Sequence, residues 1–231
     1  MVEVGRVAAL WRYPVKSMAG EALSEAEVGW NGLAGDRRWA FVRAGTERSG
    51  FPWLTLRERP ELRGYRPSFA DPEHPDRSPT LVETPSGRVL DVVDPALCAE
   101  LGDGVRVLKH DRGLFDTFPL SLLGTGTVEA LAATVGVTLD PRRFRPNLLV
   151  EAGPGAEDDW IGATLRIGTA RIRVDRPDGR CVVVNLDPAT GASDPRVLRA
   201  IARDRAGRLG VYGSTVEPGR IAVEDLVLRE P

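Results

Sequence analysis

Short strand-like segments separated by turns, with few helical stretches among them, are the feature that most limits how this chain can fold. Glycine and proline interrupt the apolar runs along the whole sequence. A doubly wound parallel sheet would require strands and helices to alternate, and here they do not. The sequence therefore predicts a mainly β fold, a β-barrel with a few helices. We expect strands over residues 2–10, 21–28, 38–42, 53–56, 80–83, 88–93, 105–108, 147–151, 164–167, 171–174, 181–186, 210–212, 220–223 and 226–228.

Three helices are predicted from the residues at their ends. The first covers residues 96–101 after Asp94-Pro95, and the third follows Asp194-Pro195 and runs to about residue 205. An acidic side chain caps free N–H groups, and proline fits the first helical turn. The second covers 127–135 and stops at a glycine. Residues 95–104 are the expected boundary region between two domains. We therefore expect a smaller β-rich domain over 1–98 and a core domain over 99–231.

Composition excludes several classes of protein. The net charge is -2, with 42% hydrophobic and 28% charged residues, so there is no general basic field for nucleic acid or an anionic membrane. Cys98 and Cys181 are the two cysteines and form no cluster, which argues against zinc or iron–sulfur sites made by this chain alone. The apolar run at the N-terminus is too short and too interrupted by charged residues for a signal peptide, and no apolar run reaches membrane-spanning length. We predict a cytoplasmic protein with reduced thiols and no membrane contact.

Four clusters of residues carry possible chemistry. Each alone is more often a solvated turn, a charged surface or, for the cysteine, ordinary packing. Cys181 fits that interpretation less well than Cys98, because a neighbouring arginine favours the thiolate that binds metals. The clusters are Tyr13-Pro14-Val15-Lys16-Ser17, Gly32-Leu33-Ala34-Gly35-Asp36-Arg37-Arg38-Trp39, Arg142-Arg143-Phe144-Arg145-Pro146-Asn147 and Arg180-Cys181 before Asp187-Pro188-Ala189-Thr190-Gly191.

In this order the clusters resemble the MOSC family, named for the C-terminal domain of molybdenum-cofactor sulfurases. The N-terminal part is similar to the family's accessory β-barrel domain, and the C-terminal part to the MOSC core. The resemblance covers nearly the whole chain. Further matching residues are Gly20, Arg57, Pro60, Phe118-Pro119, Ser121-Leu122, Glu157-Asp158, Trp160 and Gly210-Val211-Tyr212.

The resemblance implies a MOSC-type β-barrel that holds a molybdenum cofactor with a pterin. Similar members include the mitochondrial amidoxime-reducing component and its bacterial relatives. By that likeness Cys181 is the catalytic residue and the thiolate ligand of the metal, a soft ligand suited to molybdenum. The implied cofactor-binding residues are Lys16, Ser17, Arg37, Ser121, Arg143, Arg145, Asn147 and Tyr212; Arg143 has a structural pairing as its alternative.

Three functions remain open from the sequence. The first is a molybdenum-dependent oxidoreductase that reduces small N-hydroxylated or N-oxide compounds. Because no cysteine-rich ferredoxin-type domain follows, its electrons would come from a separate ferredoxin, flavodoxin or cytochrome. The second is a carrier or maturation protein for the cofactor or for sulfur, and the third is a binding module that has lost the cofactor. Gly179 departs from relatives that carry a hydroxyl residue there, and Lys109 gives no support for pyridoxal phosphate.

Overall fold

The computed structural model describes the whole chain except residue 47 and divides into two compact units. The barrel unit contains Met1–Trp11, Ala22–Ala34 and Asp116–Pro231. The accessory unit contains Arg12–Glu21 and Gly35–Phe115. The units therefore interleave along the sequence, whereas a single boundary between residues 98 and 99 was expected. The physical reason is that the first strand finds its hydrogen-bonding partners in the C-terminal half of the chain, at residues 148–151 and 226–229.

The barrel consists of seven strands closed by hydrogen bonds between its first and last members. The order is β11-β10-β14-β13-β12-β16-β1, and β1 also pairs with β11, while β2 (Glu21–Leu23) lies beside β1. Only the β10–β11 pair among these barrel pairings in the described part is parallel. The strands are β1 (Val2–Arg12), β10 (Leu120–Gly124), β11 (Leu148–Glu151), β12 (Thr164–Ile167), β13 (Ala170–Gly179), β14 (Arg208–Glu217) and β16 (Leu226–Arg229).

The core of the barrel unit is built from the inward positions of these strands. Leu122, Leu148, Ile172 and Val211 are all 0% exposed and belong to one apolar cluster. Alternation of such residues with polar ones is typical of strands that bury one face. The predicted β-barrel is therefore confirmed. A small sheet of β15 (Gly219–Ala222), β3 (Glu25–Gly29) and β4 (Gly32–Leu33) belongs to the same unit.

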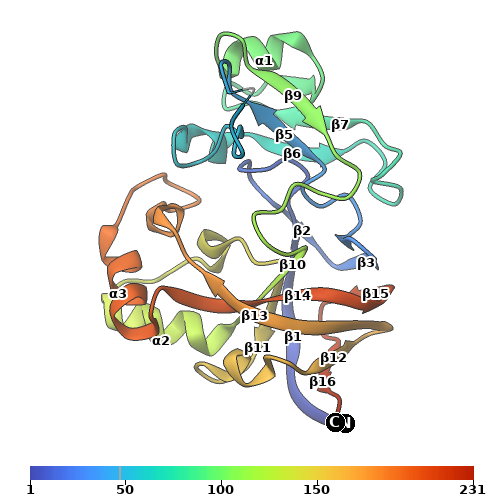
Figure 1. Cartoon of the computed structure of the whole chain (residues 1–231), viewed down its shortest axis with the longest axis vertical. Helices are drawn as coiled ribbons and strands as arrows, with labels where there is room; N and C mark the ends of the chain where they lie inside the picture. Colours follow the sequence, from blue (N-terminus) through green and yellow to red (C-terminus); the bar gives the residue numbers. More distant parts are fainter. Residues whose placement is uncertain (47) are drawn as a thin grey trace. The chain divides into compact units, whose positions relative to one another are not determined.

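Two α-helices and three short 3-10 helices complete the barrel unit. The helices α2 (Thr125–Val135) and α3 (Pro195–Arg205) contact one another and lie side by side in Figure 1. Asp194 caps α3, since its carboxylate accepts the N–H of Arg196, as the sequence predicted. The 3-10 helices are η2 (Pro141–Phe144), η3 (Ala156–Trp160) and η4 (Val182–Asn185).

The described part of the accessory unit contains two small sheets and one α-helix. Helix α1 begins after Asp94, whose side chain accepts the N–H of Ala96, and ends at Gly102 as expected. The predicted strand over 53–56 is reduced to a single bridge between Trp53 and Val42. The elements are β5 (Trp39–Val42) paired with β9 (Arg106–Lys109), the sheet of β6 (Arg66–Phe69), β7 (Thr80–Glu83) and β8 (Val89–Asp91), α1 (Pro95–Leu101) and η1 (Pro60–Gly64).

The prediction of a strand over 181–186 is wrong, because this segment forms the 3-10 helix η4. Its valines are β-branched and favour strands when a sheet edge is free. Here the carbonyls of Val184 and Asn185 instead accept hydrogen bonds from the guanidinium of Arg143. Those bonds satisfy the backbone without a neighbouring strand, so tertiary contacts override the local preference.

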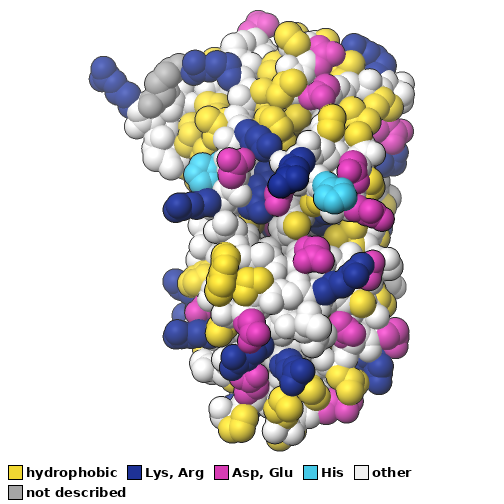
Figure 2. Space-filling model, turned by 90° about the vertical axis from the view of Figure 1, so that its right-hand side faces the viewer, with side chains coloured by type: hydrophobic (Ala, Val, Ile, Leu, Met, Phe, Trp, Pro, Cys, Tyr) yellow, Lys and Arg dark blue, Asp and Glu magenta, His cyan; other side chains and the backbone are white. Residues whose placement is uncertain are grey.

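The charges on the surface are mixed. On the face shown in Figure 2, basic and acidic side chains are interspersed, in keeping with the net charge of -2. In the part of the chain that the structure describes, no helix has the length and apolar character needed to span a membrane.

Candidate functional site

Cys181 lies in the barrel unit, immediately before η4, in an extended backbone conformation. Its thiol is free and half-buried, and the next side chain, Val182, is 52% exposed. The carbonyl of Cys181 accepts the N–H of Val184, which fixes the start of η4. The described residues contain no group of three or more His, Cys, Asp or Glu side chains able to hold a metal ion.

Arg180, the neighbour of Cys181, holds three segments together. Its Nε donates to the carbonyl of Leu209 at 2.7 Å and its Nη1 to the carbonyl of Phe144 at 2.7 Å. Its Nη2 lies 2.9 Å from Oδ2 of Asp178. The charge that the sequence suggested for activating the thiol is thus already paired. Arg180 links the segment of Cys181 to β14 and to the end of η2.

Asp178, near the end of β13, is a buried acceptor that sequence reasoning missed. Its side chain is 3% exposed. It accepts a hydrogen bond from Oγ of Ser121 at 3.0 Å and another from the hydroxyl of Tyr212. Burial raises the pKa of Tyr212, and the negative charge of Asp178 raises it further. An Asp near the end of a strand, two residues before an Arg, was the only signal in the sequence, and it is a common pattern.

Ser121 and Tyr212, both predicted cofactor ligands, therefore have partners within the fold. The ring of Tyr212 stacks on Phe118 at 6.0 Å between centroids. Asn147 is 0% exposed; its Nδ2 donates to the carbonyl of Trp11, and its Oδ1 accepts the N–H of Ser121. In this structure Asn147 ties β1 to β10.

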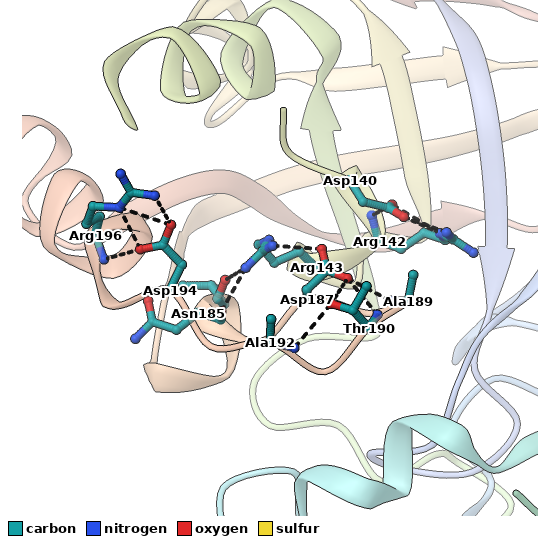
Figure 3. Close-up of polar contacts among 11 residues, drawn as sticks. Asp140, Arg142, Arg143, Asn185, Asp187, Ala189, Thr190, Ala192, Asp194 and Arg196 are labelled. Atoms are coloured by element: carbon teal, nitrogen blue, oxygen red, sulfur yellow. Dashed lines mark hydrogen bonds and ion pairs between the residues drawn. The ribbon is translucent and has the colours of Figure 1, made fainter. Parts of the chain in front are cut away.

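Arg143 has the structural role that the sequence left as its alternative. Its side chain is 5% exposed, and Nη1 donates to the carbonyls of Val184 and Asn185 at 3.1 and 2.8 Å. Nη2 donates to Asp187 at 3.1 Å (Figure 3). Arg143 therefore holds the end of η4 from the C-terminal side of Cys181.

Asp187 orders the loop that follows η4. Its carboxylate accepts the N–H groups of Ala189 and Thr190 and the hydroxyl of Thr190 (Figure 3). These hydrogen bonds, the backbone one from Thr190 foremost, keep the pKa of Asp187 below its usual value, and the charge of Arg143 adds to the effect. The Asp-Pro-Ala-Thr-Gly segment is thus a turn built around one carboxylate.

Arg145 caps η2 in the left-handed backbone region, with φ of 53°. This conformation is unfavourable for residues with a Cβ and tends to mark functional sites. Five non-glycine residues of the described chain adopt positive φ, and three of them are predicted cofactor ligands: Ser17, Arg37 and Arg145, beside Ala206 and Glu224. The side chain of Arg145 is half-buried.

The remaining predicted ligands lie in the accessory unit. Lys16 is 7% exposed and its Nζ donates to the carbonyl of Leu114 at 2.9 Å. Arg37 pairs with the fully buried Asp36, whose Oδ1 also accepts the N–H of Tyr13. The guanidinium of Arg37 lies 4.7 Å from the centre of the Tyr13 ring. Lys16 and Ser17 lie on one segment of the accessory unit and Arg37 on another. Backbone hydrogen bonds from Lys16 to Trp39 and from Arg37 to Tyr13 join the two segments.

A cavity of about 280 Å³ opens elsewhere in the barrel unit. Its walls contain none of the residues that the sequence singled out as ligands. Arg205 pairs with Asp158 at 2.6 Å, so its charge is already balanced. The lining residues are Asp158, Ile161, Pro177, Asp204, Arg205 and Arg208.

Comparison with known proteins identifies two family patterns. The pattern described as the MOSC domain matches residues 109–228, and the MOSC N-terminal beta barrel domain matches residues 4–93. The molybdenum cofactor sulfurase of Drosophila grimshawi is 26% identical over 242 residues, which cover 87% of this chain and 31% of that protein. Molybdenum cofactor sulfurase 3 of Aedes aegypti is 41% identical over 81 residues, covering 34% of this chain and 10% of that protein.

Among solved structures, the YuaD protein from Bacillus subtilis has a similar fold. The TM-score is 0.53 at 12% sequence identity, covering 97% of this chain and 94% of that protein. This chain spans less than a third of the length of the curated sulfurases, so it corresponds to one part of those proteins. Because the MOSC pattern covers more than half of the sequence and the fold is the expected barrel, the chain belongs to the MOSC domain family.

Proposed function

We propose that this protein binds a molybdenum cofactor through Cys181 and acts as an oxidoreductase on small N-hydroxylated or N-oxide compounds. The observation that carries the proposal is the setting of the thiol. Cys181 is half-buried and free, and its neighbour Arg180 is hydrogen-bonded to Phe144, the residue before the strained Arg145. The chain thus links a soft metal ligand to a strained arginine within the barrel unit.

The donor set fits the group. One thiolate, with no group of three or more His, Cys, Asp or Glu side chains among the described residues, suits a metal that a pterin already coordinates. When bound, the cofactor supplies a redox-active metal that exchanges an oxygen atom with the substrate. Gly179 leaves open space where a Cβ would stand, so the backbone beside the thiol is accessible. Arg145 supplies a planar fork of donors for a phosphate or a pterin edge.

Lys16, Ser17 and Arg37 remain proposed ligands on the accessory unit. Two of them, Ser17 and Arg37, have the same left-handed backbone conformation as Arg145. The strained backbone at these positions supports a binding role, because glycine is the residue that adopts a left-handed conformation without strain. We propose that a separate electron-donor protein reduces the enzyme.

The test compares the wild type with Cys181→Ser, and Cys98→Ser is the matched control. All three are produced in a host that makes the cofactor, and molybdenum and pterin are measured per polypeptide. We expect near-stoichiometric molybdenum in the wild type and in Cys98→Ser. Turnover of an N-hydroxylated compound is then followed with a chemical reductant, which removes the need for the natural donor.

Three outcomes separate the possibilities. Loss of turnover in Cys181→Ser alone supports the oxidoreductase. Equal turnover in the wild type and Cys181→Ser would exclude the proposed role of the thiol. The names of the sulfurase relatives favour one alternative, a carrier of the cofactor or of sulfur. Bound molybdenum without turnover in any variant would support that carrier.

A further inference from the structure

Two buried arginines hold the segment of Cys181 from opposite sides. Arg180 precedes the cysteine, and its backbone N–H also donates to the carbonyl of Gly207. Arg143 binds the far end of η4. Both side chains are nearly enclosed, at 7% and 5% exposure. The position of the thiol is therefore set by contacts that are not part of its own local chain.

Arg143 and Arg180 differ in how their charge is balanced. The partner of Arg143, Asp187, is 26% exposed, so water shares in solvating that pair. The partner of Arg180, Asp178, is 3% exposed, and the contact is an ion pair rather than an aligned hydrogen bond. A buried charge that loses its partner is strongly destabilised. The position of Arg180 therefore depends on the carboxylate of Asp178.

Asp178 is also joined to two strands on which predicted ligands lie. It accepts from Ser121 on β10 and from Tyr212 on β14, and it is itself on β13. Three strands of the barrel thus converge on one carboxylate. Gly210 leaves room for the guanidinium of Arg180, since a Cβ there would stand 3.2 Å from its Nη2.

We infer that Asp178 is a positioning residue, which fixes the Cys181 thiol for metal binding by holding Arg180 between β14 and the end of η2. This inference rests on the proposed function for the role of the thiol as a ligand. It also assigns Arg180 to scaffolding and not to the cofactor. Removing the charge of Asp178 leaves the guanidinium buried without a counter-charge, and the segment that carries Cys181 must then shift.

The experiment uses Asp178→Asn in the full chain. Asparagine keeps the shape and an acceptor for Ser121, while it removes the charge. Asp175→Asn is the matched control, because Asp175 also lies on β13 and also accepts from a serine, Ser214, at 2.7 Å. Asp175 pairs with Arg173, which is 63% exposed, and has no link to Cys181 among the contacts described.

The first measurement needs no cofactor. The alkylation rates of Cys181 and Cys98 are measured by mass spectrometry on apo protein, well below the unfolding temperature. Cys98 lies on α1 in the accessory unit, and burial raises the pKa of its thiol, so it is a slow internal reference. We expect the ratio of Cys181 to Cys98 rates to change at least tenfold in Asp178→Asn and to stay within twofold in Asp175→Asn.

The second measurement is X-ray absorption at the molybdenum edge on loaded protein. Loss of one sulfur scatterer in Asp178→Asn, with the pterin retained, is the expected signature. An unchanged alkylation ratio in a folded Asp178→Asn protein would overturn the inference, whatever its melting temperature. Absence of molybdenum from the wild type would refute the proposed function instead, and the alkylation result on apo protein would still decide whether Asp178 positions the thiol.

Discussion

The left-handed backbone at Arg145 allows stability and function to be separated. The perturbation is a pair of variants, Arg145→Ala and Arg145→Gly, neither of which has the arginine side chain. They differ only in the Cβ. At φ of 53° that Cβ is unfavourable, and a left-handed residue costs about 1–2 kcal/mol relative to a right-handed one.

The expected magnitude follows from two opposing terms. Removing the Cβ relieves the backbone strain, and glycine in turn makes the unfolded chain more flexible, which costs about 0.4–1 kcal/mol. The net gain of Arg145→Gly over Arg145→Ala is therefore about 1 kcal/mol. In a chain of this size that gain corresponds to about 2–4 °C in melting temperature.

The control is Ala206→Gly. Ala206 ends α3 with φ of 51°, so the same substitution relieves the same kind of strain where no ligand is proposed. Calorimetry should show a similar gain there. Molybdenum content should fall in both Arg145 variants and stay at the wild-type level in Ala206→Gly.

Two results would refute this reasoning. If Arg145→Gly is no more stable than Arg145→Ala, the backbone at this position is not strained. If both Arg145 variants keep full molybdenum and turnover, the strain is not retained for cofactor binding. Stabilisation by glycine together with loss of metal is the combination that the proposal requires.

Two further predictions concern the frame around the site. Gly210→Ala should lower the free energy of unfolding by about 2 kcal/mol or more, since the backbone has φ of +76° and a Cβ would lie 2.7 Å from the carbonyl oxygen of Leu122. Gly136→Ala is the control and should lose less stability, because Gly136 has φ of +78° with open space around it. Equal losses of the two variants in urea unfolding would contradict the clash. Hydrogen bonds from Arg196, the side-chain one first, lower the pKa of Asp194 from 3.8 to about 2. Its contribution to stability is therefore complete above pH 3.8 and lost as the pH falls through about 2. Asp194→Asn should make the melting temperature less dependent on pH across that range. An unchanged dependence of the melting temperature on pH would show that the charge of Asp194 is not involved.

The sequence by itself determined the class of fold and several of its helix starts and turns. The barrel, the capped starts of α1 and α3 and the hairpin between β12 and β13 follow from alternation, capping residues and turns, which act over a few neighbouring residues. The four clusters of residues also identified the family, because their order along the chain is a linear property. The predicted ligand roles stay predictions; they concern Cys181, Lys16, Ser17, Arg37, Ser121, Arg145, Asn147 and Tyr212.

Only the tertiary structure decided which polar residues hold one another. Whether Arg143 meets a ligand or the carbonyls of η4 depends on segments about forty residues apart, which no local pattern records. The same holds for Asp178, which accepts a hydrogen bond from Ser121 on β10, 57 residues away in the sequence. The unit boundaries also differ from a single cut, because β1 completes its hydrogen bonds with β11 and β16. Local preference sets the strands, whereas the burial of charge and backbone groups sets their partners.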